Sequence, residues 1–222
     1  GCRPLPVNAI ELSLFSSQVT AVCDEMGAVL RRAAFSTNIK DRLDFSCALF
    51  TTDGDLIANA PHVPVHLGSM DDSVKTLLRQ ERAALDNGAS FLANAPYNGG
   101  THLPDVTVVS PFFVDGESSP LFYVAARAHH ADIGGMTPGS MPPDSTRIEQ
   151  EGVLIECMRL VRGGRFREQA MRAVLASGPY PARNPDQNIA DLRAQLAATS
   201  RGIGELSRML GHYGAEVVRA YM

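Results

Sequence analysis

Two long amphipathic patterns, one near each end of the 222-residue chain, restrict the fold more than any other feature. In both, apolar residues recur in steps of three and four, which places them along one side of an α-helix. The first pattern covers about residues 8–35 and contains Leu12, Phe15, Val19, Val22, Met26, Val29 and Ala33. The second begins near Pro185 and contains Ile189, Leu192, Leu196, Ile203, Leu206, Leu210 and Tyr213. We expect two long helices packed on a core; for the first, binding to a partner is the alternative.

The segments between these helices predict short strands, turns and further helices. Residues 45–50 and 55–58 are predicted as strands joined at Asp53-Gly54, which is a strong hairpin signal. Further strands are predicted at residues 121–128 and 152–160. Further helices are predicted to begin at Ser69 and to cover residues 166–175. Gly202 and Gly204 indicate a bend or a close packing contact in the last helix. The order of elements predicts an α+β fold with a mixed sheet, hairpins and two long amphipathic helices, in one domain over residues 1–222.

Composition and charge exclude several classes of function. Hydrophobic residues make up 45% of the chain, and the formal net charge is -4. There is no basic patch for nucleic acid and no apolar run long enough for a membrane span. The four cysteines are scattered, without a Cys-x-x-Cys pair, which favours a reducing, cytoplasmic location. No glycine-rich phosphate loop is present.

Two patches that combine histidine with aspartate carry the strongest chemical signal. The first contains His102 and Asp105, three residues apart with Pro104 between them. On a turn, this spacing can direct both side chains to one point. The alternative is structural, with Pro104 stiffening the loop and Asp105 capping the next turn.

The second patch, His129-His130-Ala131-Asp132, follows the apolar segment 121–128. Neighbouring strand residues point to opposite faces, so at most one of the two histidines faces a given site. Imidazole and carboxylate are common ligands of divalent transition metals, and the two patches together predict a metal site.

Two other segments are candidates for substrate contacts. His62, Pro64 and His66 fall on one face of an extended segment and suggest a substrate loop or a support for the site; Pro64 excludes a regular helix through the two histidines. Residues 136–145 are rich in proline and glycine and follow the second patch directly, which predicts a lid over the site.

In their order, the motifs resemble those of the hydantoinase B/oxoprolinase family. The resemblance rests on residues 25–27, 44–47, 66–70, 99–105, 129–135, 138–140, 151–152 and 191–195. Family chains are more than twice as long, so the resemblance implies that this sequence is the N-terminal portion of a larger subunit. Where the family has Asn-Asp-Pro-Tyr, this chain has Ala95 in place of the acid.

The resemblance also implies a ligand set and a division of labour. Asp44, His102, Asp105 and either His129 or His130, with His129 preferred, would bind a divalent metal, zinc or manganese. His130 and Asp132 would support the ligands or act as acid and base. A partner A subunit would use ATP and Mg to phosphorylate the carbonyl of a small cyclic amide, and a metal-bound water would open the ring. A hetero-oligomer is implied. The alternatives are a ketone carboxylase subunit and a non-catalytic assembly module.

Overall fold

The computed structural model describes residues 8–60, 66, 68–81 and 85–222. Its helices are α1 (Ala9–Ala33), α2 (Thr37–Lys40), α4 (Met70–Glu81), α5 (Glu168–Leu175), α6 (Pro185–Tyr213) and α7 (Ala215–Tyr221), with short 3-10 turns η2 (Pro96–Asn98) and η3 (Ile148–Gln150). Its strands are β1 (Phe45–Thr51), β2 (Leu56–Ala60), β3 (Ser90–Ala93), β4 (Asp105–Phe112), β5 (Phe122–His129), β6 (Met158–Arg162) and β7 (Arg165–Phe166). The predicted α+β fold is confirmed.

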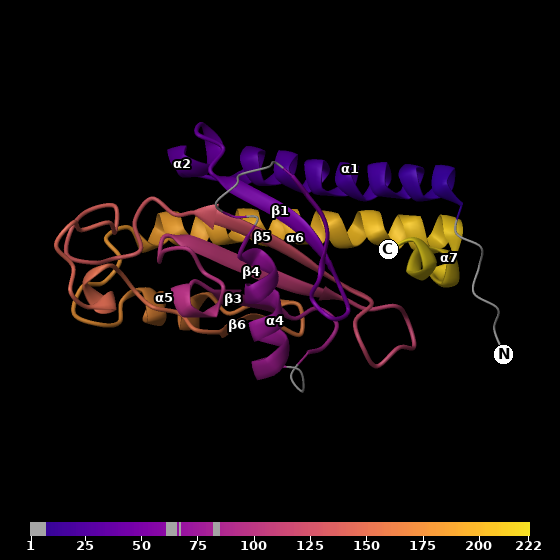
Figure 1. The fold of residues 1–222 in the computed structure, drawn as a ribbon. Coiled ribbons are helices and arrows are strands. Elements are labelled where there is room, and N and C mark those ends of the chain that lie inside the picture. The colour runs from indigo at the N-terminus through magenta and orange to yellow at the C-terminus, as the bar shows by residue number, and fades with distance from the viewer. Residues whose placement is uncertain (1–7, 61–65, 67, 82–84) are drawn as a thin grey trace.

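The strands form one sheet in the order β2-β1-β5-β4-β3-β6-β7 (Figure 1). All strand pairs among the described residues are antiparallel. The sheet, which was predicted as mixed, therefore contains no parallel pair among these residues. The predicted hairpin is present as β1 and β2. β5 lies between β4, its neighbour in the sequence, and β1, which is distant in the sequence, so the end of β1 is brought next to the ends of β4 and β5.

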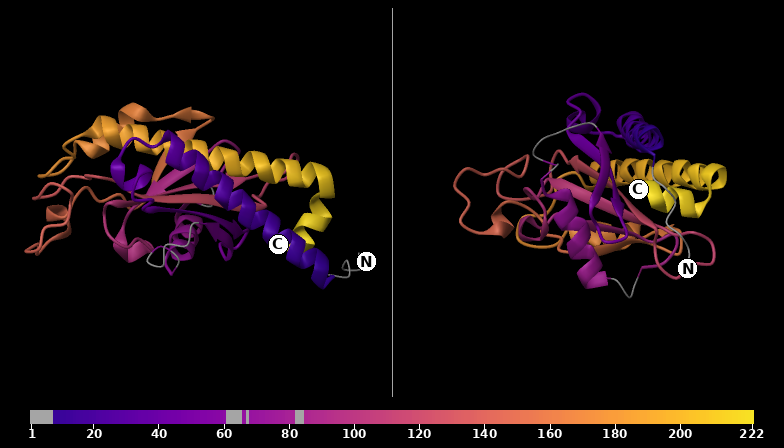
Figure 2. Two further views of the ribbon diagram at one scale, coloured as in Figure 1. Left: turned by 90° about the horizontal axis from the view of Figure 1, so that it is seen from above. Right: turned by 45° about the vertical axis from the view of Figure 1, so that its right-hand side comes forward.

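The two long helices cover one face of the sheet and α4 covers the other (Figure 2). Phe15, Val22 and Met26 of α1 are buried against β1, β5 and α6, which confirms that the first amphipathic pattern packs on the core. Leu12, at the start of that pattern, is 46% exposed. Asn8 caps α1 by accepting the N–H of Ile10, and Asn184 caps α6 in the same way through Gln187.

Helix α6 continues through Gly202, where it makes a close packing contact. A Cβ atom on Gly202 would come within 2.6 Å of the Met26 sulfur and 2.8 Å of a Val124 methyl carbon. Gly204, two residues later, has open space around it. Of the two predicted roles, close packing therefore applies to Gly202.

The strand predicted for residues 152–160 is shorter than expected and is confined to β6. The residues before β6 are hydrogen-bonded to a side chain in place of a neighbouring strand. The side-chain amide of Asn94 accepts the N–H of Ile155 and donates to the carbonyl of Val153. Phe166, placed at the start of a predicted helix, lies in β7, and α5 begins at Glu168.

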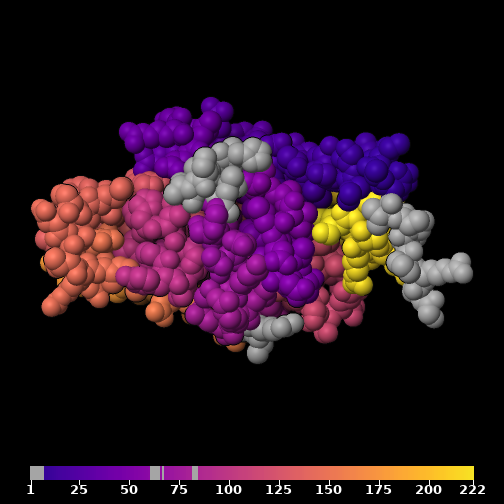
Figure 3. All heavy atoms as spheres, in the orientation of Figure 1, coloured from indigo at the N-terminus to yellow at the C-terminus, as the bar shows by residue number. Residues whose placement is uncertain are grey.

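Within the described ranges, no helix is both long and apolar enough to cross a membrane. The space-filling view places the chain that follows β5 at one end of the molecule (Figure 3, salmon).

Candidate metal centre

Three strand ends bring the predicted ligands together. Asp105 is the first residue of β4 and His129 is the last residue of β5, and the two are direct partners across the sheet. Asp44 immediately precedes β1, and its carbonyl oxygen accepts the N–H of His129 at 3.0 Å. The pairing of β1 and β4 with β5 therefore fixes the backbone of all three residues on one edge of the sheet.

Asp105 is the centre of this cluster. Its side chain is 1% exposed, and its Oδ2 lies 2.9 Å from Nδ1 of His102. Its Oδ1 lies 3.4 Å from Nδ1 of His129, which in turn is 3.6 Å from Oδ2 of Asp44. The ligand atoms of His102, Asp105 and His129 all lie within 4.8 Å of one another, and the two imidazole rings are 4.9 Å apart. The predicted His-Asp spacing at 102 and 105 therefore does direct both side chains to one point.

A third imidazole, that of His66, faces the same two carboxylates. The His66 side chain is fully buried, with Nε2 3.6 Å from Oδ2 of Asp105 and 3.8 Å from Oδ1 of Asp44. In the described part of the chain, neither His66 Nε2 nor Asp105 Oδ1 has a hydrogen-bond partner. Buried polar atoms are rarely left unpaired, because that costs about 1–3 kcal/mol each. Two such atoms among imidazoles and carboxylates are what a divalent metal would satisfy, so the residues fit the predicted ion.

Electrostatics keeps Asp105 ionised. Burial raises the pKa of its carboxyl, but contacts with the three imidazoles and with the Thr101 hydroxyl hold the pKa well below its usual range. The same contact raises the pKa of His102, because the hydrogen bond from its ring to Asp105 favours the protonated ring.

Arg127, two residues before His129, is a buried charge that sequence reasoning missed as a functional residue. Its guanidinium is fully buried and donates to Ser69, Ser73 and Thr107 and to the carbonyl of Gly99. Burial lowers the pKa of Arg127 to about 10, and the charge of Asp105 acts against that decrease. A charged residue in an apolar strand, on the same face as His129, was the signal available in the sequence.

The turn before His102 depends on this arginine and on one glycine. Gly99 has a φ of 86°, and any side chain there would overlap the backbone of Ser73. Its carbonyl accepts from both Arg127 and Ser73. Ala95 is buried, and its carbonyl accepts the N–H of Gly100. The turn is thus fixed against α4 on the face that carries the cluster.

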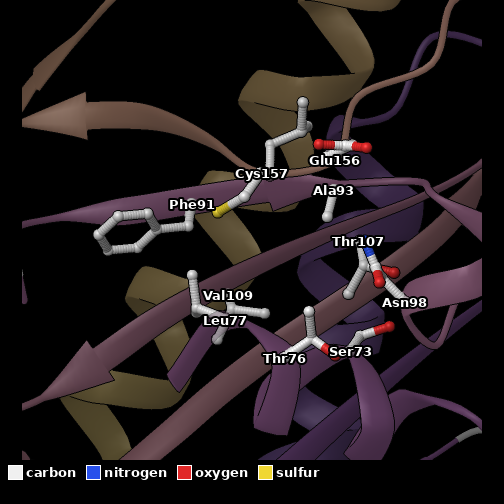
Figure 4. A pocket seen from close by; sticks show the side chains of 11 residues that line it. Ser73, Thr76, Leu77, Phe91, Ala93, Asn98, Thr107, Val109, Glu156 and Cys157 are labelled. Carbon is white, nitrogen blue, oxygen red and sulfur yellow. The ribbon is translucent and has the colours of Figure 1, made fainter. Parts of the chain in front are cut away.

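A pocket lies between α4, β3 and β4 (Figure 4). Ser73 and Thr107, which bind the guanidinium, line this pocket together with Phe91, Glu156 and Cys157. None of the cluster's ligands is part of the lining. The pocket is therefore on the same face of the sheet as the metal cluster but separate from it.

The structure places His130 and Asp132 away from the cluster. His130 is buried on the opposite face, where its ring nitrogens lie 3.0 Å from the side-chain amides of Asn188 and Gln195 in α6. Burial lowers its pKa. Asp132 accepts from the backbone of Gly134 and Gly139 and forms an ion pair with Arg183. These contacts hold the loop after β5; the predicted catalytic roles of both residues stay predictions.

Two further predictions concern segments around the site. In the loop of residues 136–145, the Ser140 hydroxyl is buried and donates to the carbonyl of Gly134, while it accepts the N–H of Ile133. The lid function of this loop stays a prediction. His62 and Pro64 lie outside the described residues, and the prediction for that segment can be followed at His66 alone.

Comparison with known proteins relates this chain to one family. The hydantoinase B/oxoprolinase family model matches residues 8–222. A 5-oxoprolinase from Dictyostelium discoideum is 46% identical over 216 residues, which are 97% of this chain and 17% of that protein. The chain thus spans about a sixth of the length of that relative.

Two solved structures share the fold. The ATP-dependent caprolactamase from Pseudomonas jessenii matches with a TM-score of 0.86 at 28% identity, over 98% of this chain and 36% of that one. A nucleotide-free acetone carboxylase matches with a TM-score of 0.87 at 18% identity, over 96% of this chain and 27% of that one, and supports the fold alone. The family match, together with a clustered arrangement of the motif residues, identifies the chain as a member of the hydantoinase B/oxoprolinase family.

Proposed function

We propose that this chain provides the metal centre of an ATP-dependent hydrolase that opens cyclic amides, with Asp44, His102, Asp105 and His129 as ligands. The observation that carries the proposal is the buried, ionised Asp105, which faces imidazoles with one oxygen unpaired. The names of the relatives, 5-oxoprolinase and caprolactamase, support a cyclic amide as the substrate class.

The ligand set suits zinc or manganese, since both accept imidazole and carboxylate donors. When bound, such an ion lowers the pKa of a water molecule and polarises an acceptor oxygen, which is the chemistry that amide hydrolysis needs.

The chain's own residues prepare the site for that ion. Asp105 remains ionised at neutral pH because its contacts hold its pKa low, so it provides a permanent negative charge. The hydrogen bonds of Arg127 to Ser73 and Gly99 hold the turn that leads to His102. On the other face, the amides of Asn188 and Gln195 hold His130, which fixes the end of β5 and therefore the position of His129. We assign His130 this positioning role, and we assign Asp132 the role of holding the loop after β5 through Gly134, Gly139 and Arg183.

Activation of the substrate is assigned to a partner. An unactivated cyclic amide is a poor electrophile, and the sequence contains no phosphate loop. We propose that an A-type subunit or segment uses ATP and Mg to phosphorylate the carbonyl, and that the activated ring then reaches this centre. The name of a relative from Pseudomonas jessenii, caprolactamase subunit beta, agrees with a multi-subunit assembly.

The test is metal analysis of the purified protein after loading with zinc or manganese and removal of excess ion. We expect about one tightly bound ion in the wild type and a large loss in His102→Ala, because His102 and Asp105 face each other across 2.9 Å. His212→Ala is the matched control, since its ring contacts Tyr213 at the far end of α6. Circular dichroism of each variant separates ligand loss from unfolding. A wild type that stays free of metal after loading contradicts the proposal.

A further inference from the structure

His66 is tethered at one ring nitrogen and unpaired at the other. Nδ1 lies 3.0 Å from the hydroxyl of Ser46, a fully buried residue of β1 that faces Arg127 across the sheet. Nε2, on the opposite side of the ring, points to Asp44 and Asp105. The ring is therefore held in one orientation, with a single nitrogen directed at the candidate metal centre.

The distances from Nε2 are too long for hydrogen bonds. Its nearest carboxylate oxygens are 3.6 and 3.8 Å away, whereas N–H···O bonds are about 2.7–3.2 Å long. A fully buried nitrogen aimed at two acidic side chains, without a hydrogen bond to either, requires another explanation.

A shared ion explains these distances. Two atoms that bind one zinc ion tetrahedrally, each at about 2.0–2.1 Å, lie roughly 3.4 Å apart. The gaps between His129 and its two carboxylates are 3.4 and 3.6 Å, and those of His66 fall in nearly the same range. His66 thus approaches the same two carboxylates as His129 at similar distances, but through the other oxygen of each: Oδ1 of Asp44 and Oδ2 of Asp105.

We propose that His66 is a further ligand of the metal centre, through Nε2, an inference that rests on the proposed function. In this arrangement the neutral ring donates its Nδ1–H to Ser46, the type of second hydrogen bond that fixes a metal-binding histidine. The full set is then three imidazoles and two carboxylates. Five protein donors exceed the four of a closed zinc site, so an ion that accepts five or six ligands fits the set.

The experiment is a cobalt(II) titration of the purified protein, followed by visible absorption and by competition with a chelator. Loss of a partner that only supports a ligand typically costs 10–100-fold in metal affinity. We therefore expect His66→Ala to lower cobalt affinity by more than about 100-fold and to change the absorption bands. Ser46→Ala should lower affinity by only about 10–100-fold and keep the bands, since the ligand remains. His212→Ala should match the wild type.

A second measurement does not depend on the folding of any variant. In wild-type protein labelled with ¹⁵N-histidine and loaded with zinc, the nitrogen shifts report which rings bind the ion. We expect three coordinated rings. Two coordinated rings, or unchanged cobalt bands in folded His66→Ala, overturn the role of His66 but leave the proposed function intact. A wild type that binds no metal overturns both.

Discussion

At the scale of single residues, Asp105 shows how opposing effects are balanced. Burial penalises an ionised carboxylate by several kcal/mol, which explains why burial acts to raise its pKa. Four polar neighbours outweigh that penalty, so the folded chain keeps the charge. The stability that this charge contributes is fully present above the pKa of an unfolded aspartate and is lost only as the pH falls toward the depressed value of the folded state.

The thiol of Cys157 provides a test of electrostatics outside the cluster. Burial, with a smaller effect from Glu81, raises its pKa to about 12, so its reactive thiolate is scarce at neutral pH. At pH 8 we expect iodoacetamide to label Cys157 about a thousandfold more slowly than in denatured protein, from thiolate fractions alone. The rate should still rise with pH above 9, where an ordinary thiol levels off.

Peptide mapping by mass spectrometry in a Cys2→Ser background isolates this reaction. Cys23 and Cys47 are buried and serve as internal comparisons. Rapid labelling of Cys157 at pH 8, with a plateau above 9, would show that its surroundings do not raise its pKa.

The sequence allowed part of the site to be predicted, for reasons specific to each residue. His102 and Asp105 are close in the chain, and strand alternation separated His129 from His130. The position of His66 beside Asp44 and Asp105 is not specified by spacing in the sequence. Arg127 was read as an interruption of an apolar strand, because the polar partners that satisfy it, Ser73 among them, come from distant segments.

At the scale of elements, the long periodic helices were the most predictable parts of the fold, and short segments were the least. β4 has no counterpart among the predicted elements, although its residues are buried throughout. Residues 152–157 are apolar enough for a strand, but the side chain of Asn94 takes the place of a strand partner there. A single buried amide can decide such a segment, and local propensity does not detect it.

The contact between α1 and α6 can be tested with two glycines on one helix. Gly202→Ala should destabilise the protein by about 1–3 kcal/mol, because its Cβ would press on the buried Met26 and on a strand residue, Val124. Gly204→Ala should stabilise it by up to about 1 kcal/mol, since alanine favours a helix and the site is open. Urea denaturation of both variants measures the difference. Equal effects would contradict a close α1–α6 contact at Gly202.

At the scale of the whole molecule, the candidate centre lies where three inner strands of the sheet begin or end. Because the chain spans only 17% of its relative from Dictyostelium discoideum, most of that protein's mass lies beyond the fold described above. We expect ATP binding and substrate activation to reside in that additional mass.

We therefore expect this chain alone neither to bind ATP tightly nor to open 5-oxoproline or hydantoin rings. Activity should appear when an A-type subunit and the remainder of the B subunit are added. The measurement is ATP-dependent ring opening, with the His102→Ala chain as the control for a dependence on this centre. Robust turnover by the chain alone would contradict the division of labour.

The adjacent histidines at the end of β5 have a consequence for folding. A slip of one residue in the pairing of β5 that placed His130 opposite Asp105 would exchange the faces of His129 and His130, yet an imidazole would still stand beside Asp105. The cluster by itself would then tolerate a misaligned strand. Two features outside the cluster make the shifted register unfavourable. Arg127 would turn toward the apolar layer under α1 and α6. The amides of Asn188 and Gln195 would lose the imidazole ring that they bind. Helix α6, on the opposite face from the site, therefore helps to select the correct register of β5, the strand that carries His129.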